Sequence, residues 1–199
     1  MNIIVTGFEP FLDNEINPTL EVLKLLPKNI EGHNIITVRL PVLYDQCFDV
    51  LKPYIIKYNP GIIINLGLAA KRNNICLERV AINMSHSTHK DNAGIVKIDE
   101  TIIKDGENAY FSKLPIRKIL YKIGEKGIPV VISNTAGLYV CNNIMYHVLH
   151  YINSNNLNIK AGFIHVPFMD SQVQNKLENS LPIDTILEAV LDSIKASIE

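Results

Sequence analysis

The feature that most constrains the fold is a nearly unbroken apolar run at residues 61–69, GIIINLGLA. Its length suits a single β-strand and falls far short of a membrane span. A strand that is apolar at almost every position must be covered on both faces, as the central strands of parallel sheets are. The run therefore predicts an internal strand of a sheet that lies between two layers of helices.

The rest of the chain alternates strand and helix patterns. Apolar runs predict strands at 2–6, 34–40, 128–132 and 161–166, and periodicity predicts helices at 44–58, 114–125 and 183–198 and one that begins at Asn17-Pro18. Pro53 inside one of these helices predicts a kink or a break. Residues 71–110 lose the alternation, and short strands around 79–83 and 94–98 predict a hairpin-like excursion from the sheet. We therefore expect a single α/β domain over residues 1–199, a sandwich with a largely parallel twisted sheet and helices on both faces.

Residues 128–145, IPVVISNTAGLYVCNNIM, place a cysteine where a strand has turned and a helix begins. Turn-forming residues follow the strand, and Cys141 comes after them. The apolar residues beyond it fall on one helix face, at Ile144, Met145, Val148, Leu149 and Ile152. Unpaired N–H groups and the helix dipole favour the thiolate at such a position, and the thiolate is the nucleophilic form of cysteine. A buried structural cysteine at a packed turn is the alternative.

A thiol nucleophile needs a base or an imidazolium partner, and a further group that orients this partner. His165 lies in the apolar run GFIHVPF near a strand end, where a polar side chain is costly unless it is hydrogen-bonded. Glu78, in LERVAIN, is a candidate for the orienting carboxylate. Because triads are set by geometry and not by chain order, Glu78, Cys141 and His165 are compatible with one. A hydrogen-bonded core histidine and a solvated Glu–Arg pair remain the alternatives.

Composition disfavours several classes of function. The net charge is −1 without a basic or acidic block, so neither nucleic acid nor an anionic membrane is expected as a partner. His86 and His89 share one polar tract, but no third ligand has suitable spacing, so we expect no metal. The first residues lack the pattern of a secretion signal, and three cysteines are too few for a disulfide framework, so we expect a cytoplasmic protein.

Several separated blocks of the sequence resemble pyrrolidone-carboxylate peptidase, also called pyroglutamyl peptidase I, a family of cysteine peptidases. The blocks are TGFEPF followed by Asn17-Pro18, LPV at 40–42, the end of the apolar run with Arg72, ERVAIN at 78–83, DNAG at 91–94, SNTAGLYVCN at 133–142 and GFIHVP at 162–167. They extend over most of the chain, from residue 1 to about residue 172. ERVAIN, AGLYVCN and FIHVP together make the resemblance specific.

The resemblance implies an exopeptidase that removes an N-terminal pyroglutamyl (5-oxoproline) residue from peptides through a thioacyl-enzyme, without a metal or another cofactor. It implies a catalytic triad of Glu78, Cys141 and His165. It also implies an apolar pocket for the lactam ring, with walls from Phe8, Phe11, Tyr139 and Val140. The fold implied is a single α/β sandwich, assembled as a homo-oligomer that is often a tetramer.

Two departures from the family pattern leave an alternative open. Many relatives read Gly-Gln-Ala-x-Gly-Arg after the central strand, where this chain has Leu68 for the Gln and Lys71 for the second Gly. Relatives also often have an Arg before the Asp-Asn pair, where this chain reads STHK at 87–90. The alternative is a catalytically weak or silent relative that binds a lactam or a small amide. A phosphorylase-like protein would need a glycine-rich phosphate loop, which the sequence lacks.

Overall fold

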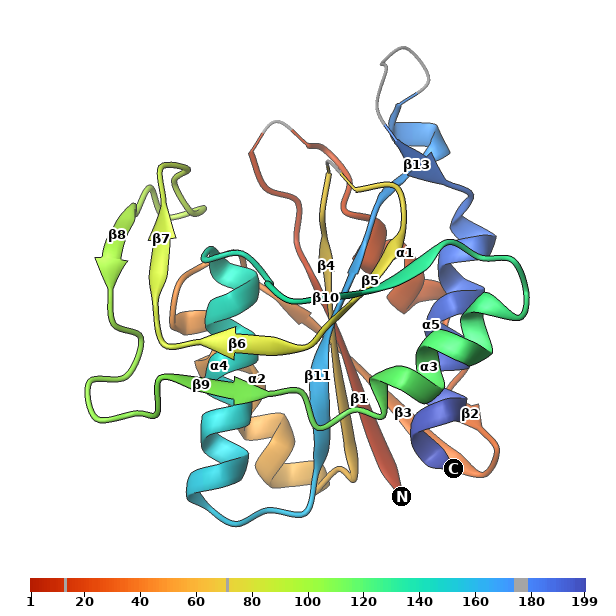
Figure 1. Ribbon diagram of the computed structural model, residues 1–199, viewed down its shortest axis with the longest axis horizontal. Helices are drawn as coiled ribbons and strands as arrows, with labels where there is room; N and C mark the ends of the chain where they lie inside the picture. Colours follow the sequence, from red (N-terminus) through yellow and green to blue (C-terminus); the bar gives the residue numbers. More distant parts are fainter. Residues whose placement is uncertain (13, 71, 174–178) are drawn as a thin grey trace.

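A twisted seven-stranded sheet forms the middle layer of the protein (Figure 1). The computed structural model describes residues 1–12, 14–70, 72–173 and 179–199. The strands of the sheet are β1 (Asn2–Phe8), β2 (Asn29–Ile30), β3 (His33–Leu40), β4 (Ile62–Leu68), β5 (Ile75–Glu78), β10 (Val130–Ser133) and β11 (Lys160–Val166). They lie in the order β10-β5-β11-β4-β1-β3-β2. Most neighbours are parallel, which confirms the predicted sheet, but β5 runs antiparallel to β11 and β2 antiparallel to β3.

Helices cover both faces of this sheet, as the sequence predicts (Figure 1). They are α1 (Pro18–Leu25), α2 (Gln46–Tyr58), α3 (Ile116–Gly124), α4 (Val140–Ser154) and α5 (Ile183–Ile198). Side chains alternate along each strand, so Ile3 and Val5 pack with α1, α3 and α5, whereas Ile4 packs with α2 and α4. The sandwich therefore has two apolar cores, one on each side of the sheet.

The apolar run at 61–69 occupies the centre of the sheet. Every residue of β4 is buried between its neighbours β1 and β11. Ile62 and Ile64 face one core and Ile63 faces the other, which explains why the run has almost no polar position.

Two helix predictions had different outcomes. Asn17 caps α1 as expected, because its Oδ1 accepts a hydrogen bond from the N–H of Thr19 and Pro18 is the first helical residue. Pro53 does not break α2, which continues from Gln46 to Tyr58. Burial of its apolar face against the sheet and α4 compensates for the hydrogen bond that Pro53 cannot donate.

The excursion between residues 71 and 110 is more complex than the predicted hairpin. It contains β6 (Val80–Ile82), β7 (Ser85–Ser87), β8 (Lys97–Glu100) and β9 (Ala109–Phe111), paired as β6 with β9 and β7 with β8. The sequence patterns also missed β5, and Glu78 is the last residue of this strand of the main sheet, two positions before β6. Two short strands, β12 (Phe168–Met169) and β13 (Ser180–Leu181), pair near the start of α5. Within the described ranges, no helix is long and apolar enough to cross a membrane.

Candidate active site

Cys141 is the second residue of α4, as the strand–turn–helix pattern predicts. Tyr139 is the N-cap residue, and its carbonyl accepts the first helical hydrogen bond from the N–H of Asn143 at 3.1 Å. No side chain in the described part of the chain caps this helix start. The N–H groups of the first turn therefore remain able to bind a negatively charged oxygen.

A glycine on the neighbouring strand makes room for the thiol. Gly67 lies on β4, where a Cβ atom would stand 3.1 Å from Cys141 Sγ and 2.5 Å from the ring of Phe163. Side chains larger than hydrogen at this position would displace the ring or the sulfur. The glycine thus lets the start of α4 approach the sheet closely, and it leaves Cys141 half-buried.

His165 lies near the end of β11, opposite Gly67 in the register of the sheet, and only 5% of it is exposed. Its Nδ1 lies 2.8 Å from Glu78 Oε1. Burial lowers the pKa of His165, but the charges of Cys141 and Glu78 and the hydrogen bonds to them outweigh burial and raise this pKa to about 9. The ring is therefore an imidazolium at neutral pH.

Glu78 is fully buried at the end of β5. Because β5 runs antiparallel to β11, its last residue pairs with Phe163, two positions before His165. The carboxylate then extends along the sheet to the imidazole. Its Oε1 also accepts a hydrogen bond at 3.0 Å from Nη1 of Arg72, a contact that the sequence reasoning missed.

The thiol and the imidazole open into an apolar cavity of about 240 Å³. The four side chains proposed from the resemblance all line it, namely Phe8, Phe11, Tyr139 and Val140. Phe11 and Tyr139 form one wall, with ring centroids 6.3 Å apart. The cavity is large enough for a small ring, and the ionisable residues that line it in the described chain are Arg72, Tyr139, Cys141 and His165.

None of the other histidines, all within the described ranges, lines this cavity. His147 stacks on Phe48 at 5.3 Å and contacts Asp45, and His150 lies 3.0 Å from the hydroxyl of Tyr110. His86 pairs with Asp99 at the surface. In the ranges that the structure covers, no group of three or more His, Cys, Asp or Glu side chains could hold a metal ion.

Two asparagines after the cysteine connect α4 to the excursion, and the sequence reasoning did not single them out. The buried Asn142 accepts a hydrogen bond from the N–H of Ile82 and donates to the carbonyls of Ile82 and Met84, at 2.9–3.0 Å. Asn143 donates to the hydroxyl of Ser85 in the excursion at 3.3 Å, and it also accepts from the N–H of Asp45 and donates to the carboxylate of Asp45. The feature of the sequence that could have indicated these contacts is the pair of asparagines directly after the candidate nucleophile.

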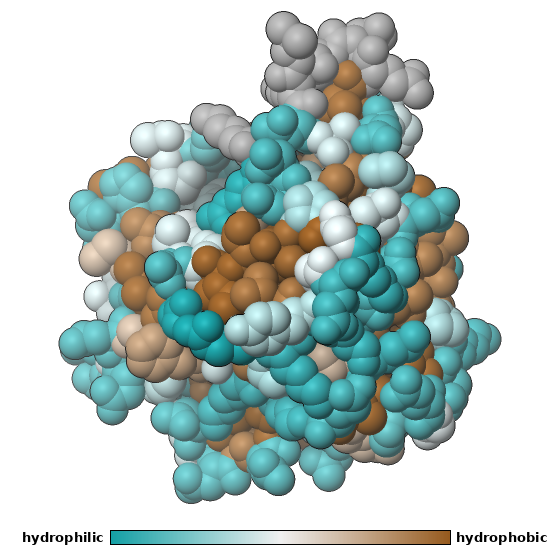
Figure 2. Space-filling model, turned by 45° about the vertical axis from the view of Figure 1, so that its right-hand side comes forward, coloured by the Kyte–Doolittle hydropathy of each residue, from teal (hydrophilic) through white to brown (hydrophobic). Residues whose placement is uncertain are grey.

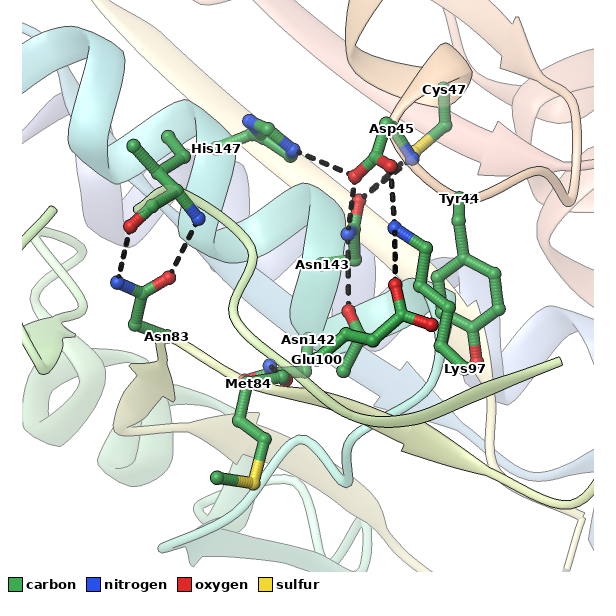
Figure 3. Close-up of polar contacts among 12 residues, drawn as sticks. Tyr44, Asp45, Cys47, Asn83, Met84, Lys97, Glu100, Asn142, Asn143 and His147 are labelled. Atoms are coloured by element: carbon green, nitrogen blue, oxygen red, sulfur yellow. Dashed lines mark hydrogen bonds and ion pairs between the residues drawn. The ribbon is translucent and has the colours of Figure 1, made fainter. Parts of the chain in front are cut away.

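Asp45 is the centre of a charged network behind this helix (Figure 3). Its carboxylate contacts Nε2 of His147 at 3.2 Å and Nζ of Lys97 at 2.6 Å, besides Asn143. The hydrogen bond with His147 and the contacts with Lys97 and Asn143 hold the pKa of Asp45 well below its usual range, although partial burial opposes this. Since Lys97 is on β8, the network anchors the β7–β8 pair to the helix of Cys141.

Among the described residues, the positions that depart from the family pattern lie at the cavity or contact its wall. Leu68 lines the cavity. Lys71 lies outside the described residues. In the 87–90 tract, His89 and Lys90 are exposed, and the carbonyl of Lys90 accepts a hydrogen bond at 2.9 Å from the hydroxyl of Tyr139. This tract therefore contacts the cavity wall through its backbone.

Comparison with known sequences identifies relatives over the full length. A family model described as pyroglutamyl peptidase matches residues 1–199. A pyrrolidone-carboxylate peptidase of Clostridium perfringens strain 13 is 43% identical over 199 residues, which are 100% of this chain and 93% of the relative. One from Thermosipho africanus is 44% identical over 200 residues, with 100% of this chain and 98% of the relative covered.

Solved structures agree with the sequence comparison. A mutant pyrrolidone carboxyl peptidase from Pyrococcus furiosus superimposes with a TM-score of 0.95 at 38% identity, covering 100% of this chain and 98% of that one. The pyroglutamyl peptidase I of Bacillus amyloliquefaciens has a TM-score of 0.95 at 36% identity, with 100% and 95% covered.

Proposed function

This chain belongs to the pyroglutamyl peptidase family of cysteine peptidases, and we propose that it removes N-terminal pyroglutamate from peptides with Cys141 as nucleophile, His165 as acid and base, and Glu78 as orienting carboxylate. The observation that supports these roles most is the position of Cys141. It lies at an uncapped helix start, next to a buried imidazolium, at the mouth of an apolar cavity.

Acylation begins when the Cys141 thiolate attacks the carbonyl carbon of the pyroglutamyl residue. The carbonyl oxygen becomes an oxyanion, and the N–H groups of the first turn of α4 stabilise it. As the tetrahedral intermediate collapses, the C–N bond breaks and the His165 imidazolium gives its proton to the leaving amine. The products of this half-reaction are a thioester on Cys141, a neutral imidazole and the shortened peptide.

Deacylation restores the starting state. Neutral His165 takes a proton from water, and the hydroxide attacks the thioester carbonyl. Collapse breaks the C–S bond, which releases pyroglutamic acid and regenerates the thiolate–imidazolium pair. Glu78 acts throughout by holding the imidazole through Nδ1, which leaves Nε2 for the reacting atoms.

The cavity accounts for the substrate class. A lactam ring is uncharged and compact, so a largely apolar pocket with a few backbone hydrogen bonds suits it. We propose that Phe8, Phe11, Tyr139 and Val140 contact this ring. Since the ring has no preceding residue, a pocket that has room for the ring alone selects the end of a chain and excludes internal peptide bonds.

A fluorogenic pyroglutamyl amide tests the function directly. We expect hydrolysis that ends when iodoacetamide modifies Cys141, because the thioester route needs the thiol. The leucyl amide with the same fluorophore is the matched control, and it should not be cleaved. Binding of the pyroglutamyl amide without turnover would instead support the silent relative, for which Leu68 in the cavity is the structural argument.

We propose further that the protein is cytoplasmic and forms a homo-oligomer, with a tetramer as the expected size. Cys47, Cys76 and Cys141 are all free thiols, which suits a reducing compartment. Large apolar side chains are exposed, among them Phe111 at 71%, Ile98 at 52% and Ile82 at 37%. Figure 2 shows hydrophobic residues gathered in a patch on one face, a feature that is common where copies of a chain meet.

A further inference from the structure

The buried carboxylate of Glu78 has a second cationic partner besides His165, the guanidinium of Arg72. The side chain of Glu78 is fully buried, and a buried carboxylate is stable in its charged form only with close partners. Both partners in the described chain bind the same oxygen, Oε1, with His165 Nδ1 at 2.8 Å and Arg72 Nη1 at 3.0 Å. Oε2 has no hydrogen-bond partner among the described residues. Arg72 therefore makes one of the two hydrogen bonds that this carboxylate has among the described residues.

Arg72 also contacts the loop that leads to the nucleophile. Its Nη2 donates a hydrogen bond at 3.1 Å to the carbonyl of Thr135, six residues before Cys141. Thr135 is held in turn by Ser133, whose hydroxyl donates to the same carbonyl at 3.0 Å. One guanidinium thus joins the end of β5 to the loop between β10 and α4. Its planar group of donors suits two acceptors at fixed positions better than an ammonium does.

Charge balance gives Arg72 a second role. In the resting state of the proposed function, the thiolate of Cys141 and the carboxylate of Glu78 are negative, and the imidazolium of His165 is positive. Arg72 supplies the remaining positive charge, and it lines the same cavity as the sulfur and the imidazole. His89 and Lys90, in the tract where relatives often have an arginine, are exposed and contribute no cationic side chain to the described cavity lining.

Four other ionisable groups around this site stay neutral at neutral pH, whereas the buried Asp91 places a carboxylate near Tyr139. Burial raises the pKa of Cys76, Cys47 and Tyr44, and it raises that of Tyr139 to about 12. Cys76 on β5 lies beside Arg72, Cys47 on α2 lies on the side of Cys141, and Tyr44 packs edge-on against Tyr139 in the cavity wall. None of them supplies a positive charge at neutral pH, so within the described residues the balance depends on Arg72 and His165.

We propose that Arg72 is a positioning residue of the reaction, which fixes the ionised Glu78 toward His165 and balances the charge of the thiolate. This inference rests on the proposed function. It predicts that loss of the guanidinium charge makes the site bind protons more tightly. The thiolate would then form at higher pH, and the step that needs an oriented imidazolium would be slower.

The test compares Arg72→Met, Arg72→Lys and Arg79→Met. Arg79 is the matched control, because it follows Glu78, bonds to Asn134 at 2.8 Å and does not line the cavity. Alkylation of Cys141 by iodoacetamide, followed by peptide mapping across pH, reports thiolate formation without substrate. Steady-state kinetics on a pyroglutamyl amide separates kcat from KM, and thermal unfolding establishes that each variant is folded.

We expect Arg72→Met to move the midpoint of the alkylation profile up by about half a pH unit or more. It should also lower kcat about tenfold or more with little change in KM. Arg72→Lys should keep the midpoint near the wild-type value and lose part of kcat, because lysine keeps the positive charge but lacks the planar set of donors of the guanidinium. Arg79→Met should change neither. If Arg72→Met does not fold, Arg72→Gln replaces it, since an amide is uncharged and can still donate a hydrogen bond.

Three outcomes would overturn the inference. The first is a folded Arg72→Met variant with the wild-type midpoint and kcat. The second is a change in KM alone, which would make Arg72 a substrate contact. The third is the same shift of midpoint in Arg72→Lys as in Arg72→Met, which would exclude charge as the cause. Absence of hydrolysis by the wild-type protein would instead refute the proposed function, and the alkylation profiles would still report on Arg72.

Discussion

Cys141 and His165 are the single residues on which the proposed chemistry depends most. Replacing either one by alanine should lower kcat by roughly a thousandfold or more, because members of a triad act as a unit. Thermal unfolding near the wild-type temperature would establish that the fold persists. Substantial turnover by either folded variant would show that the thiol–imidazole pair is not the catalyst.

The pH dependence follows from the raised pKa of His165. This pKa lies at about 9 in the folded protein, above the ordinary value of 6.5, so the stabilisation from the charged ring is complete below pH 6.5 and is lost as pH rises through 9. We expect the free energy of unfolding to decline over this interval, and kcat/KM to fall as pH approaches and passes 9, where the folded enzyme loses the proton of His165. Glu78→Gln removes one of the causes of the raised pKa, so the descending limb should move to lower pH, with a smaller loss of kcat than in Cys141→Ala. If the descending limb of the kcat/KM profile stays at the same pH in Glu78→Gln, Glu78 does not raise the pKa of His165.

Phe11 tests the pocket wall. Phe11→Ala should raise KM for a pyroglutamyl amide more than it lowers kcat, because ring contacts are made in the ground state and in the transition state alike. Tyr121→Ala is the control, since Tyr121 is an aromatic residue 65% exposed on α3, outside the cavity lining. An unchanged KM in Phe11→Ala would mean that this loop does not contact the lactam.

At the scale of elements, the network around Asp45 predicts how the β7–β8 pair is anchored to α4. Asp45→Asn should destabilise the protein at pH 7, because the amide cannot replace the ionic contact with Lys97. The pKa of Asp45 is depressed, so its contribution is present above the ordinary value of 3.8 and is lost as pH falls below it. The difference in unfolding free energy between the wild type and Asp45→Asn should therefore shrink toward pH 3. Asp99→Asn, which removes a surface pair with His86, should show little difference at pH 7.

The same scale shows where sequence reasoning succeeded and where it could not. The strand, turn and helix around Cys141 were predicted because they are local, with turn formers between two clear periodicities. The four residues of β5 were missed because the strand is short and because it pairs with β11, a strand far away in the sequence. The contact of Glu78 with Arg72 depends on that strand, so no pattern indicated it. The hydrogen bonds that attach β6 and β7 to α4, from Ile82 to Asn142 and from Asn143 to Ser85, likewise join residues far apart in the sequence.

For the whole molecule, we propose that residues 1–199 form one cooperative unit. The sheet takes strands from both halves of the sequence, and α5, the last helix, packs against α1 and α3. Thermal and denaturant unfolding should therefore give one coincident transition by circular dichroism and by tyrosine fluorescence. Two separated transitions would indicate independent parts.

Assembly is a separate property of the whole molecule. Light scattering after size exclusion should give a mass near four times the chain mass of 22.4 kDa, if the exposed apolar side chains cover one another in a tetramer. Dilution should leave this mass unchanged over the range used for kinetics. A mass of one chain at all concentrations would contradict the proposed assembly while leaving the active site unaffected.

The central claim is that Cys141 is the activated thiol, and competition among the three cysteines tests it most directly. Cys47 and Cys76 are buried, and burial raises the pKa of both thiols. A sub-stoichiometric dose of iodoacetamide near neutral pH should label Cys141 first, with activity falling in proportion and with 2-pyrrolidone slowing the reaction by covering the sulfur. Peptide mapping by mass spectrometry gives the order of labelling. Prior alkylation of Cys47 or Cys76 with activity retained would contradict the account.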